Sequence, residues 1–529
     1  MSGSPGVARV ASAMSTSLVV VIALAIATPV VVVVASIADP ATDVWRELWA
    51  TRLPGMLVDT ATLLVTVLAG TLGLGVGLAW LVTSFTFPGQ RLLGWLLVTP
   101  LAIPGYVLGF VWLETLAGPL GARAVRSIWL CAFVLTLTLY PYVYLFARAA
   151  FREQSLRSID VARSLGCTSF QAWWRVTLPL ARPSLATGAA LVGMEVLTDI
   201  GTVRLFNVST VADGVIRVWF GTGDRNAASE LAVLLIVAVV VLVGIERLLR
   251  GRARYSQAGG AVRSDPGRPT SLGGYAAMVA GWSVFALAVV LPVSQLLRWA
   301  GQARASGQTA TVAGDLPFHL WSSVKVAGLA TLVCLAIGLL LVAVLRGRER
   351  LGPIVARLAT LGYAVPGPVV AVGVVITLAA VDRRGWAPDG LFLVGSLAGL
   401  VYALVVRFLA IAHQGIDASL TKVPANVRAS AQVLGARRWR LATKIELPMA
   451  RAGILAATAL VAVDALKELP VTLLLRPFGT DTLSVWVWQA TSEALWIQAA
   501  VPSLAIVSLG MVLVIVLLAA LERGGEVTS

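Results

Sequence analysis

Five ionisable residues stand inside two apolar runs of this 529-residue sequence. Glu195 and Asp199 lie four residues apart in the first run, and Asp464, Lys467 and Glu468 take matching places in the second. A spacing of three or four residues puts side chains on one face of a helix, so each set is expected to share a face. An ionisable group at membrane depth costs about 2.5–3.5 kcal/mol on insertion scales. These side chains should therefore face protein or water.

Two interpretations of these residues remain open. In the functional one, Glu195, Asp199, Asp464, Lys467 and Glu468 line a translocation path, where their charge favours a cationic or metal-bearing solute. In the structural one, they are contacts that hold two parts of the chain together. Lys467 then pairs with Asp464 or Glu468, and Arg204 pairs with Asp199.

Other residues that could do chemistry are few and scattered. His319 and His413 are the only histidines, and they lie at the ends of different apolar runs. Cys131, Cys167 and Cys334 lack metal-binding spacing. The sequence also contains no Gly-x-x-x-x-Gly-Lys-Ser/Thr motif. It therefore predicts no catalytic residue, no metal site and no nucleotide site.

Two polar segments repeat one pattern, at a spacing of 269 residues (435 − 166). Each has an alanine four residues before a glycine, and a Leu-Pro pair that ends thirteen residues after it. A glycine here can end one short helix in the left-handed conformation and let another begin. An amphipathic hairpin on the membrane surface would explain one copy. It does not explain the same spacing twice. The repeated residues are Ala162, Gly166, Leu178 and Pro179, and then Ala431, Gly435, Leu447 and Pro448.

The composition places these residues in a membrane protein. Hydrophobic residues make up 58% of the chain and charged residues 13%, whereas a soluble domain is roughly half apolar and a quarter charged. A spanning helix needs about 20 mostly apolar residues. We expect an all-α integral membrane protein with about twelve transmembrane helices, arranged as two tandem repeats of six. The expected spans are 17–38, 58–82, 92–115, 127–148, 184–203, 230–249, 275–297, 322–345, 356–380, 392–413, 453–475 and 497–521.

The net charge of +15 is interpreted through the same topology. Basic residues gather in loops 149–183 and 414–452 and in the central linker. This is the bias of cytoplasmic loops, so it does not indicate a nucleic-acid partner. Both polar segments and both termini are then cytoplasmic. The predicted domains are 1–250 and 274–529, joined by a cytoplasmic linker at 251–273.

Two of the expected spans contain a Pro-Gly pair, at Pro104-Gly105 and at Pro366-Gly367. Such a pair interrupts the hydrogen-bond ladder of a helix, which is tolerated where the break faces protein or a water-filled path. The breaks are therefore either packing kinks or bends that line a pathway.

The repeated segments resemble the cytoplasmic signature of permease subunits of binding-protein-dependent ABC importers of the type I fold. That signature reads Glu-Ala-Ala, three residues, Gly and then Leu-Pro. The first copy has Asp160 in the acidic place, whereas the second has Ala429 there. Because the second copy lacks the acid, the two copies are not expected to make equal contacts with the ATPase. The fused double arrangement and the stretch from Asp464 to Phe478 look most like the ferric iron branch.

The resemblance implies partners and a mechanism. Each polar loop would dock into a separate ABC ATPase subunit of a homodimer, through Asp160, Ala162, Gly166, Leu178 and Pro179, or through Ala431, Gly435, Leu447 and Pro448. The partner subunits would use ATP, and this chain would bind no cofactor. A periplasmic or lipid-anchored solute-binding protein would deliver the solute to a multi-pass protein of the bacterial inner membrane, surrounded by lipid.

Alternative functions remain. The same machinery could import thiamine or a phosphonate, because fused permeases for those solutes look similar. A secondary transporter also has six plus six helices, but it would need its own ion-coupling site and would not use two matched docking loops. A membrane-embedded enzyme would need convergent acid, base or metal groups, which these scattered residues do not supply.

Overall fold

The computed structural model describes residues 5–153, 164–250, 272–307, 309–346, 348–386 and 392–526. These residues form helices and connecting turns, and the described ranges contain no β-strand. Apolar runs long enough to span a bilayer can satisfy their backbone groups internally only as helices or closed barrels, which explains the helical architecture. The structure therefore confirms the all-α class.

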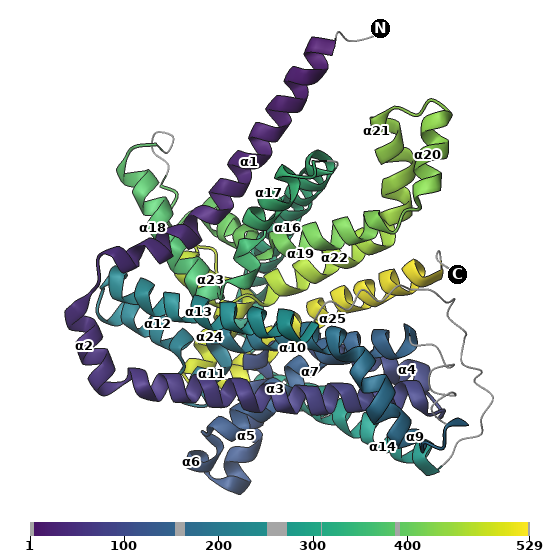
Figure 1. Cartoon of the computed structure of the whole chain (residues 1–529). Helices are drawn as coiled ribbons and strands as arrows, with labels where there is room; N and C mark the ends of the chain where they lie inside the picture. Colours follow the sequence, from purple (N-terminus) through teal and green to yellow (C-terminus); the bar gives the residue numbers. More distant parts are fainter. Residues whose placement is uncertain are drawn as a thin grey trace.

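The first half of the chain runs from a long amino-terminal helix to a long helix that ends at Arg250 (Figure 1). Its elements are α1 (Pro5–Ala35), η1 (Ser36–Ala38), α2 (Thr42–Thr51), α3 (Leu53–Ser84), α4 (Gln90–Leu96), η2 (Thr99–Ala102), α5 (Gly105–Leu120), α6 (Ala122–Val125), α7 (Ile128–Glu153), α9 (Ser169–Ala172), η3 (Trp173–Thr177), α10 (Leu178–Thr198), α11 (Gly201–Leu205), α12 (Val211–Gly221) and α13 (Arg225–Arg250).

The second half repeats this succession of long and short helices. Its elements are α14 (Leu272–Phe285), η4 (Ala286–Val290), α15 (Leu291–Ala305), α16 (Thr309–Leu345), α17 (Leu351–Ala359), η5 (Leu361–Ala364), α18 (Gly367–Arg383), α19 (Leu397–Thr421), α20 (Ala425–Val433), α21 (Arg438–Leu441), η6 (Ala442–Glu446), α22 (Leu447–Lys467), α23 (Pro470–Leu475), α24 (Leu483–Ser492) and α25 (Trp496–Glu526).

The repeat is most regular around the two polar segments. The series α9, η3, α10 and α11 returns as α21, η6, α22 and α23, with every first residue 269 positions later. Even the π-helical turns η3 and η6 keep this spacing. The two halves are thus structural copies. Most of the predicted linker, residues 251–271, lies outside the described residues.

Within the described ranges, nine helices are long and apolar enough to cross a membrane. A tenth span arises if the pair 90–102 and 105–120, bent by 93°, counts as one. The two remaining expected spans contain α10 and α18. α10 carries Arg182 and Glu195, and α18 has only 17 residues. Two expected spans had wrong ends. A break after Thr198 divides the run 184–203, and a break after Lys467 divides the run 453–475.

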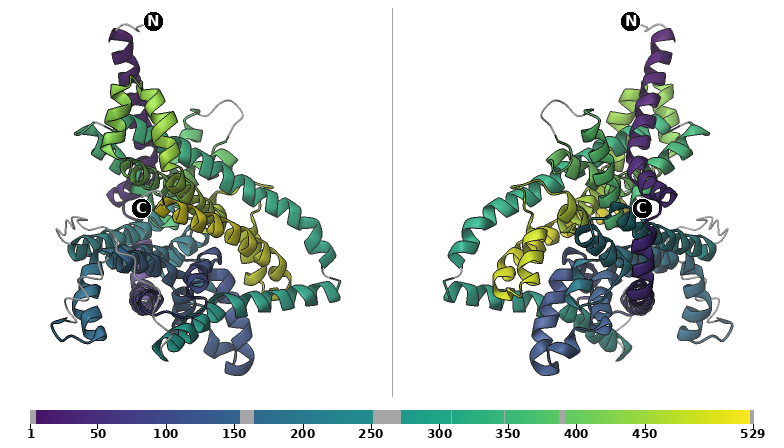
Figure 2. Two further views of the ribbon diagram at one scale, coloured as in Figure 1. Left: turned by 90° about the vertical axis from the view of Figure 1, so that its right-hand side faces the viewer. Right: turned by 90° about the vertical axis from the view of Figure 1, so that its left-hand side faces the viewer.

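The two halves interlock through their first helices. α1 packs along α17 and α18 of the second half, while α14 contacts α3 and α4 and α15 contacts α5 of the first half. Figure 2 shows the α14–α15 segment extending along the first-half helices, while α15 also packs against α25 of its own half. The two large apolar cores accordingly combine residues of both halves.

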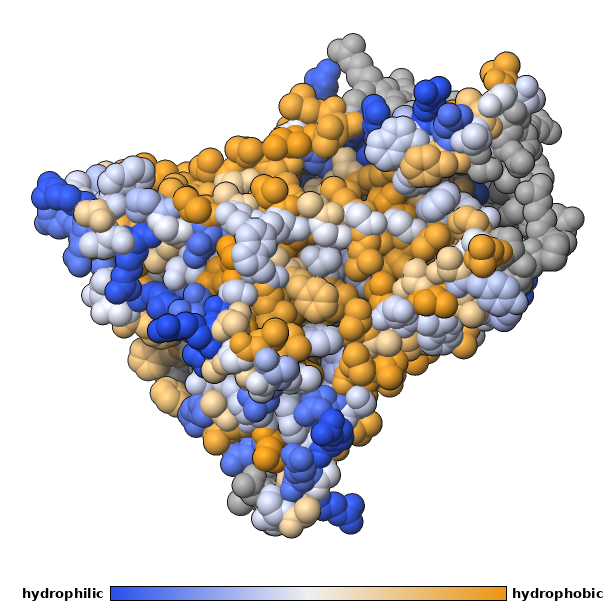
Figure 3. All heavy atoms as spheres, turned by 90° about the horizontal axis from the view of Figure 1, so that it is seen from below, coloured by the Kyte–Doolittle hydropathy of each residue, from blue (hydrophilic) through white to orange (hydrophobic). Residues whose placement is uncertain are grey.

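The outer surface suits a lipid environment. Large apolar side chains point outward along the long helices, as at Val31, Val240 and Leu332. Figure 3 shows apolar side chains over the middle of one face, with hydrophilic residues gathered toward its corners. Exposed apolar surface of this extent on long helices is the surface that a membrane covers.

Candidate functional site

The acidic residues lie at two breaks in the helices. α10 ends at Thr198 and α22 ends at Lys467, and the next residues, Asp199 and Glu468, have extended backbones with ψ of 127° and 123°. The expectation that Glu195 and Asp199, or Asp464 and Glu468, share one helix face is therefore wrong. Asp199 and Glu468 turn out of the helix because their carboxylates accept hydrogen bonds from the short helix that follows.

Each carboxylate caps the first turn of that short helix. Asp199 Oδ1 accepts from the backbone N–H groups of Thr202, at 2.9 Å, and Val203, at 3.0 Å. Thr202 Oγ1 donates to Asp199 Oδ2 at 2.7 Å. In the second half, the backbone N–H of Val471 donates to Glu468 Oε1 at 3.1 Å. Free N–H groups at a helix start favour a negative charge, so both acids are stabilised there.

Arg407 is a residue of this centre that sequence reasoning missed. It lies on α19 with 8% of its surface exposed, and its Nη1 is 3.3 Å from Glu468 Oε1. The available signal was an arginine inside the expected span 392–413. Such a residue is costly in a membrane unless it has a partner. Arg407 and Glu468 thus form a buried ion pair between α19 and the break before α23.

The proposed pairings are partly correct. Lys467 Nζ lies 2.9 Å from Asp464 Oδ1, as the structural interpretation expected. Arg204 pairs with Asp213 and not with Asp199. The reason is geometric: Asp199 is turned toward the start of α11, whereas Arg204 lies near its end and reaches Asp213 in the next helix, α12.

The Pro-Gly breaks lie against the same centre. A Cβ atom on Gly105 would come within 2.7 Å of Thr202 Oγ1, and one on Gly367 within 1.8 Å of Arg407 Nη1. A third glycine, Gly201, would place a Cβ 2.9 Å from Leu469 Cδ2 of the other half. The missing side chains therefore let the broken backbones, the charged groups and the two halves approach closely.

Glu195 lines a small cavity beside this centre. Its walls also include Thr198 of α10, Pro366 at the second break and Arg407. The volume is about 20 Å³, which is enough for one water molecule. Asp464 is 6% exposed and lies in the ion pair with Lys467. That a solute path is lined by the five charged residues stays a prediction; they are Glu195, Asp199, Asp464, Lys467 and Glu468.

Each polar segment contains a glycine in the left-handed conformation, followed by a short helix, α9 or α21. Gly166 has a φ of 87° and Gly435 a φ of 79°, the conformation that glycine adopts without steric cost. In the second copy, Gly435 N–H donates to Gln432 O at 3.0 Å, and Ala436 N–H donates to Ala431 O at 2.9 Å. This pair of bonds closes α20 in a Schellman motif. The predicted helix end is therefore confirmed at Gly435, whereas residues 154–163 before Gly166 lie outside the described residues.

The other predicted docking residues lie around these turns. Leu178-Pro179 and Leu447-Pro448 begin α10 and α22, directly after the π-helical turns η3 and η6. The residues before these pairs, Thr177 and Glu446, are themselves helical, so each proline interrupts the hydrogen-bond ladder of a longer helix beside its π-helical turn. Ala431 is buried inside α20. Asp160 and Ala162 lie outside the described residues. The docking role of all these residues stays a prediction.

Matching apolar side chains project from the two copies. Leu165 is 79% exposed and Leu434, 269 positions later, is 86% exposed. Phe170 and Trp439 are 60% and 77% exposed at the same spacing. A hollow of about 430 Å³ opens beside Leu434, between α20 and η6. Large exposed apolar side chains on a polar loop are typical of a protein interface.

Both loops project toward one side of the molecule. In Figure 1, α20 and α21 lie at the upper right and α9 at the lower right, whereas α2 and the end of α18 lie at the left. The left view of Figure 2 shows the two loops at opposite ends of that right-hand side. The two loops are therefore well separated from each other on this side.

Comparison with known proteins identifies the family of the chain. The chain matches the family described as "Binding-protein-dependent transport system inner membrane component" twice, over residues 72–255 and 334–524. It is 27% identical, over 85% of its length and 87% of the relative, to the Fe(3+)-transport system permease protein FbpB 2 of Haemophilus influenzae. Two shorter relatives match one part of the chain. The molybdate/tungstate permease protein WtpB of Thermococcus kodakarensis is 26% identical (37% of this chain, 76% of the relative), and the sulfate permease protein CysT of Escherichia coli 28% (34% and 69%).

The fold and the paired loops define a membrane-spanning transport subunit. More narrowly, the chain belongs to the family of inner membrane components of binding-protein-dependent transport systems, and it carries two copies of the family's domain. It is a multi-pass inner-membrane permease of an ABC importer, which works with ATPase and solute-binding partners.

Proposed function

We propose that the chain forms the complete solute pathway of an ATP-driven importer for ferric iron. The observation that carries this proposal is the relative named for Fe(3+) transport, which matches over most of both chains. The relatives named for sulfate and for molybdate or tungstate match shorter parts. A single chain with two pathway halves and two loops needs no second permease subunit.

The charges at the centre favour a cation over an oxyanion. Four carboxylates, those of Glu195, Asp199, Asp464 and Glu468, stand against the two cations Arg407 and Lys467. In their ionised forms these groups sum to two negative charges. A low-dielectric centre with excess negative charge attracts cations and repels sulfate or molybdate. The location of this centre at the contact between the halves supports a role in the pathway.

The partners follow from the same proposal. Each polar loop docks on one ATPase subunit of a homodimer, and those subunits bind and hydrolyse ATP. The chain itself binds no cofactor and has no enzymatic site. The loops, the linker and both termini lie in the cytoplasm, because the basic residues gather on that side. A solute-binding protein meets the opposite face.

Uptake by the reconstituted complex tests the solute. Proteoliposomes would contain this chain, its ATPase subunits and its solute-binding protein, with ATP inside. We expect ATP-dependent uptake of labelled ferric ions, with sulfate, molybdate, thiamine and phosphonate taken up no faster than in liposomes without the chain. Uptake of one of these other solutes instead of ferric ions would contradict the proposed specificity.

A further inference from the structure

We propose that the two docking loops are held in place by different chemistry: the second by ion pairs centred on Glu446, and the first by aromatic contacts centred on Trp173. Glu446 is then a positioning residue that sets the second loop against the membrane helices. The proposal rests on the proposed function, because it concerns how ATPase movement reaches the pathway.

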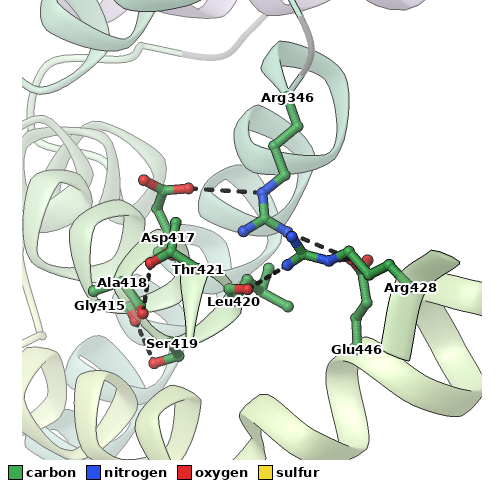
Figure 4. Close-up of polar contacts among 9 residues, drawn as sticks. All are labelled: Arg346, Gly415, Asp417, Ala418, Ser419, Leu420, Thr421, Arg428 and Glu446. Atoms are coloured by element: carbon green, nitrogen blue, oxygen red, sulfur yellow. Dashed lines mark hydrogen bonds and ion pairs between the residues drawn. The ribbon is translucent and has the colours of Figure 1, made fainter. Parts of the chain in front are cut away.

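Glu446 is the last residue of the π-helical turn η6, and its side chain is 16% exposed. Arg428 of α20 donates from Nε to Glu446 Oε1 at 2.7 Å. This pair connects α20 with η6, the helical segments before and after Gly435 in the second loop (Figure 4). Arg428 Nη2 also donates to the backbone carbonyl of Leu420, at 2.5 Å, so the arginine reaches the end of α19.

A second arginine joins the loop to the membrane helices. Arg346 follows α16 directly, and its Nη1 lies 3.7 Å from Glu446 Oε1. Its Nε lies 3.9 Å from Asp417 Oδ1 of α19. Figure 4 shows the two guanidinium groups side by side near Glu446. One carboxylate therefore connects α16, α20 and α22, and Arg346 extends the network to α19.

The first copy cannot build this network. At the corresponding positions, 269 residues earlier, it has Thr177 in place of Glu446 and Ile159 in place of Arg428. Asp417 is replaced by Arg148, which is buried and donates from Nη1 to the carbonyl of Gly94 at 2.7 Å. The charges that hold the second loop are therefore absent from the first by sequence.

Aromatic rings take the corresponding place in the first copy. The Trp173 ring of η3 lies 5.1 Å, centroid to centroid, from that of Trp80 in α3. Phe170 and Trp174 flank Trp173 at 5.8 Å and 5.9 Å. The second copy has Ala442 in place of Trp173. α3 and α16 are counterparts, because Leu53-Pro54 in α3 matches Leu316-Pro317 in α16. Each loop is therefore anchored to the same helix of its own half, the first through aromatic rings and the second through charges.

The two anchors should respond differently to substitution. Removing one charge from a half-buried pair leaves the other poorly compensated, whereas a ring contact is lost by shrinking the ring. A glutamine at position 446 has the size of glutamate but no charge. The second loop should therefore lose its position in the variant Glu446→Gln.

The test compares Glu446→Gln with Glu349→Gln in the complete reconstituted complex. Glu349 is an exposed residue shortly after Arg346, so its variant is a matched control. The readout is the number of labelled ferric ions taken up per ATP hydrolysed. We expect a roughly fivefold lower ratio for Glu446→Gln, because residues that touch in one ion-pair network depend on each other, and an unchanged ratio for Glu349→Gln. The conservative variant Glu446→Asp, which keeps the carboxylate between Arg428 and Arg346, should recover at least half of the loss.

The outcomes separate the inference from the function on which it rests. If the wild-type chain retains no ATPase subunits, the proposed function fails. If the wild type transports and Glu446→Gln keeps the wild-type ratio, the ion-pair anchor is wrong. If Glu446→Gln is poorly inserted, Glu446→Asp decides: failure to restore both yield and ratio overturns the anchor, and recovery supports it.

Discussion

Replacing Arg407 with methionine is expected to abolish most transport, with a loss of at least about a hundredfold, which corresponds to roughly 2.7 kcal/mol. Arg407 is buried and pairs with Glu468 at the break between α22 and α23. Without it, Glu468 remains as a buried charge with one backbone donor, from Val471. Breaking a buried pair on one side costs about 3–5 kcal/mol, so the variant should also unfold at lower temperature.

Neutralising the partner should reverse much of this effect on stability. In the double variant Arg407→Met with Glu468→Gln, no uncompensated charge remains at this position, and the unfolding temperature in detergent should return most of the way to wild type. Transport should stay low if the pair also serves the pathway. The control is Glu493→Gln, which changes an exposed residue outside this centre. Full stability and activity in the single Arg407→Met variant would contradict the importance of the pair.

Proline in place of Gly166 or Gly435 is expected to uncouple transport from ATP hydrolysis. Both glycines have φ near +80°, whereas proline fixes φ near −65°. The turn that holds the two arms of each loop must then change shape, although the spans are untouched. We expect uptake to fall at least about tenfold, or about 1.4 kcal/mol, while the protein still inserts and the ATPase remains active.

Asparagine at the same positions provides the control. Asparagine tolerates the left-handed conformation better than other residues with a side chain, so Gly166→Asn and Gly435→Asn should keep most of the uptake. The measurement is uptake and ATP hydrolysis in the same proteoliposome preparation. Unchanged uptake in both proline variants would rule out a docking role for the loops.

The sequence was sufficient for the class of fold and for the location of the polar loops. Composition indicated a membrane protein, and the pattern around Gly166 and Gly435 repeated at a constant spacing that the structure keeps. A left-handed glycine is predictable because few other residues adopt that backbone. The wrong boundaries near Thr198 and Lys467 arose because apolar residues continue past each break.

The geometry of the charged centre could not be predicted in the same way. Whether Asp199 lies on a helix or caps the next one depends on backbone N–H groups of Thr202 and Val203, which a periodic pattern does not reveal. The pairing of Arg407 with Glu468 joins residues 61 positions apart. Such contacts depend on how the helices pack in three dimensions, and sequence spacing alone gives no register for them.

The central claim is that one chain docks two ATPase subunits through its two loops. Single cysteines at Leu165 and Leu434 test it directly, because both side chains are exposed and occupy matching positions. Cys167 would first be replaced by serine, whereas Cys131 and Cys334 are buried and can stay.

The complex would be treated with a short bifunctional thiol reagent that links these cysteines to cysteines introduced around the docking cleft of the ATPase. The account predicts that each single variant links one ATPase subunit and that the double variant links two to the same chain. No cross-link at either position in a complex that is active in transport would contradict the account.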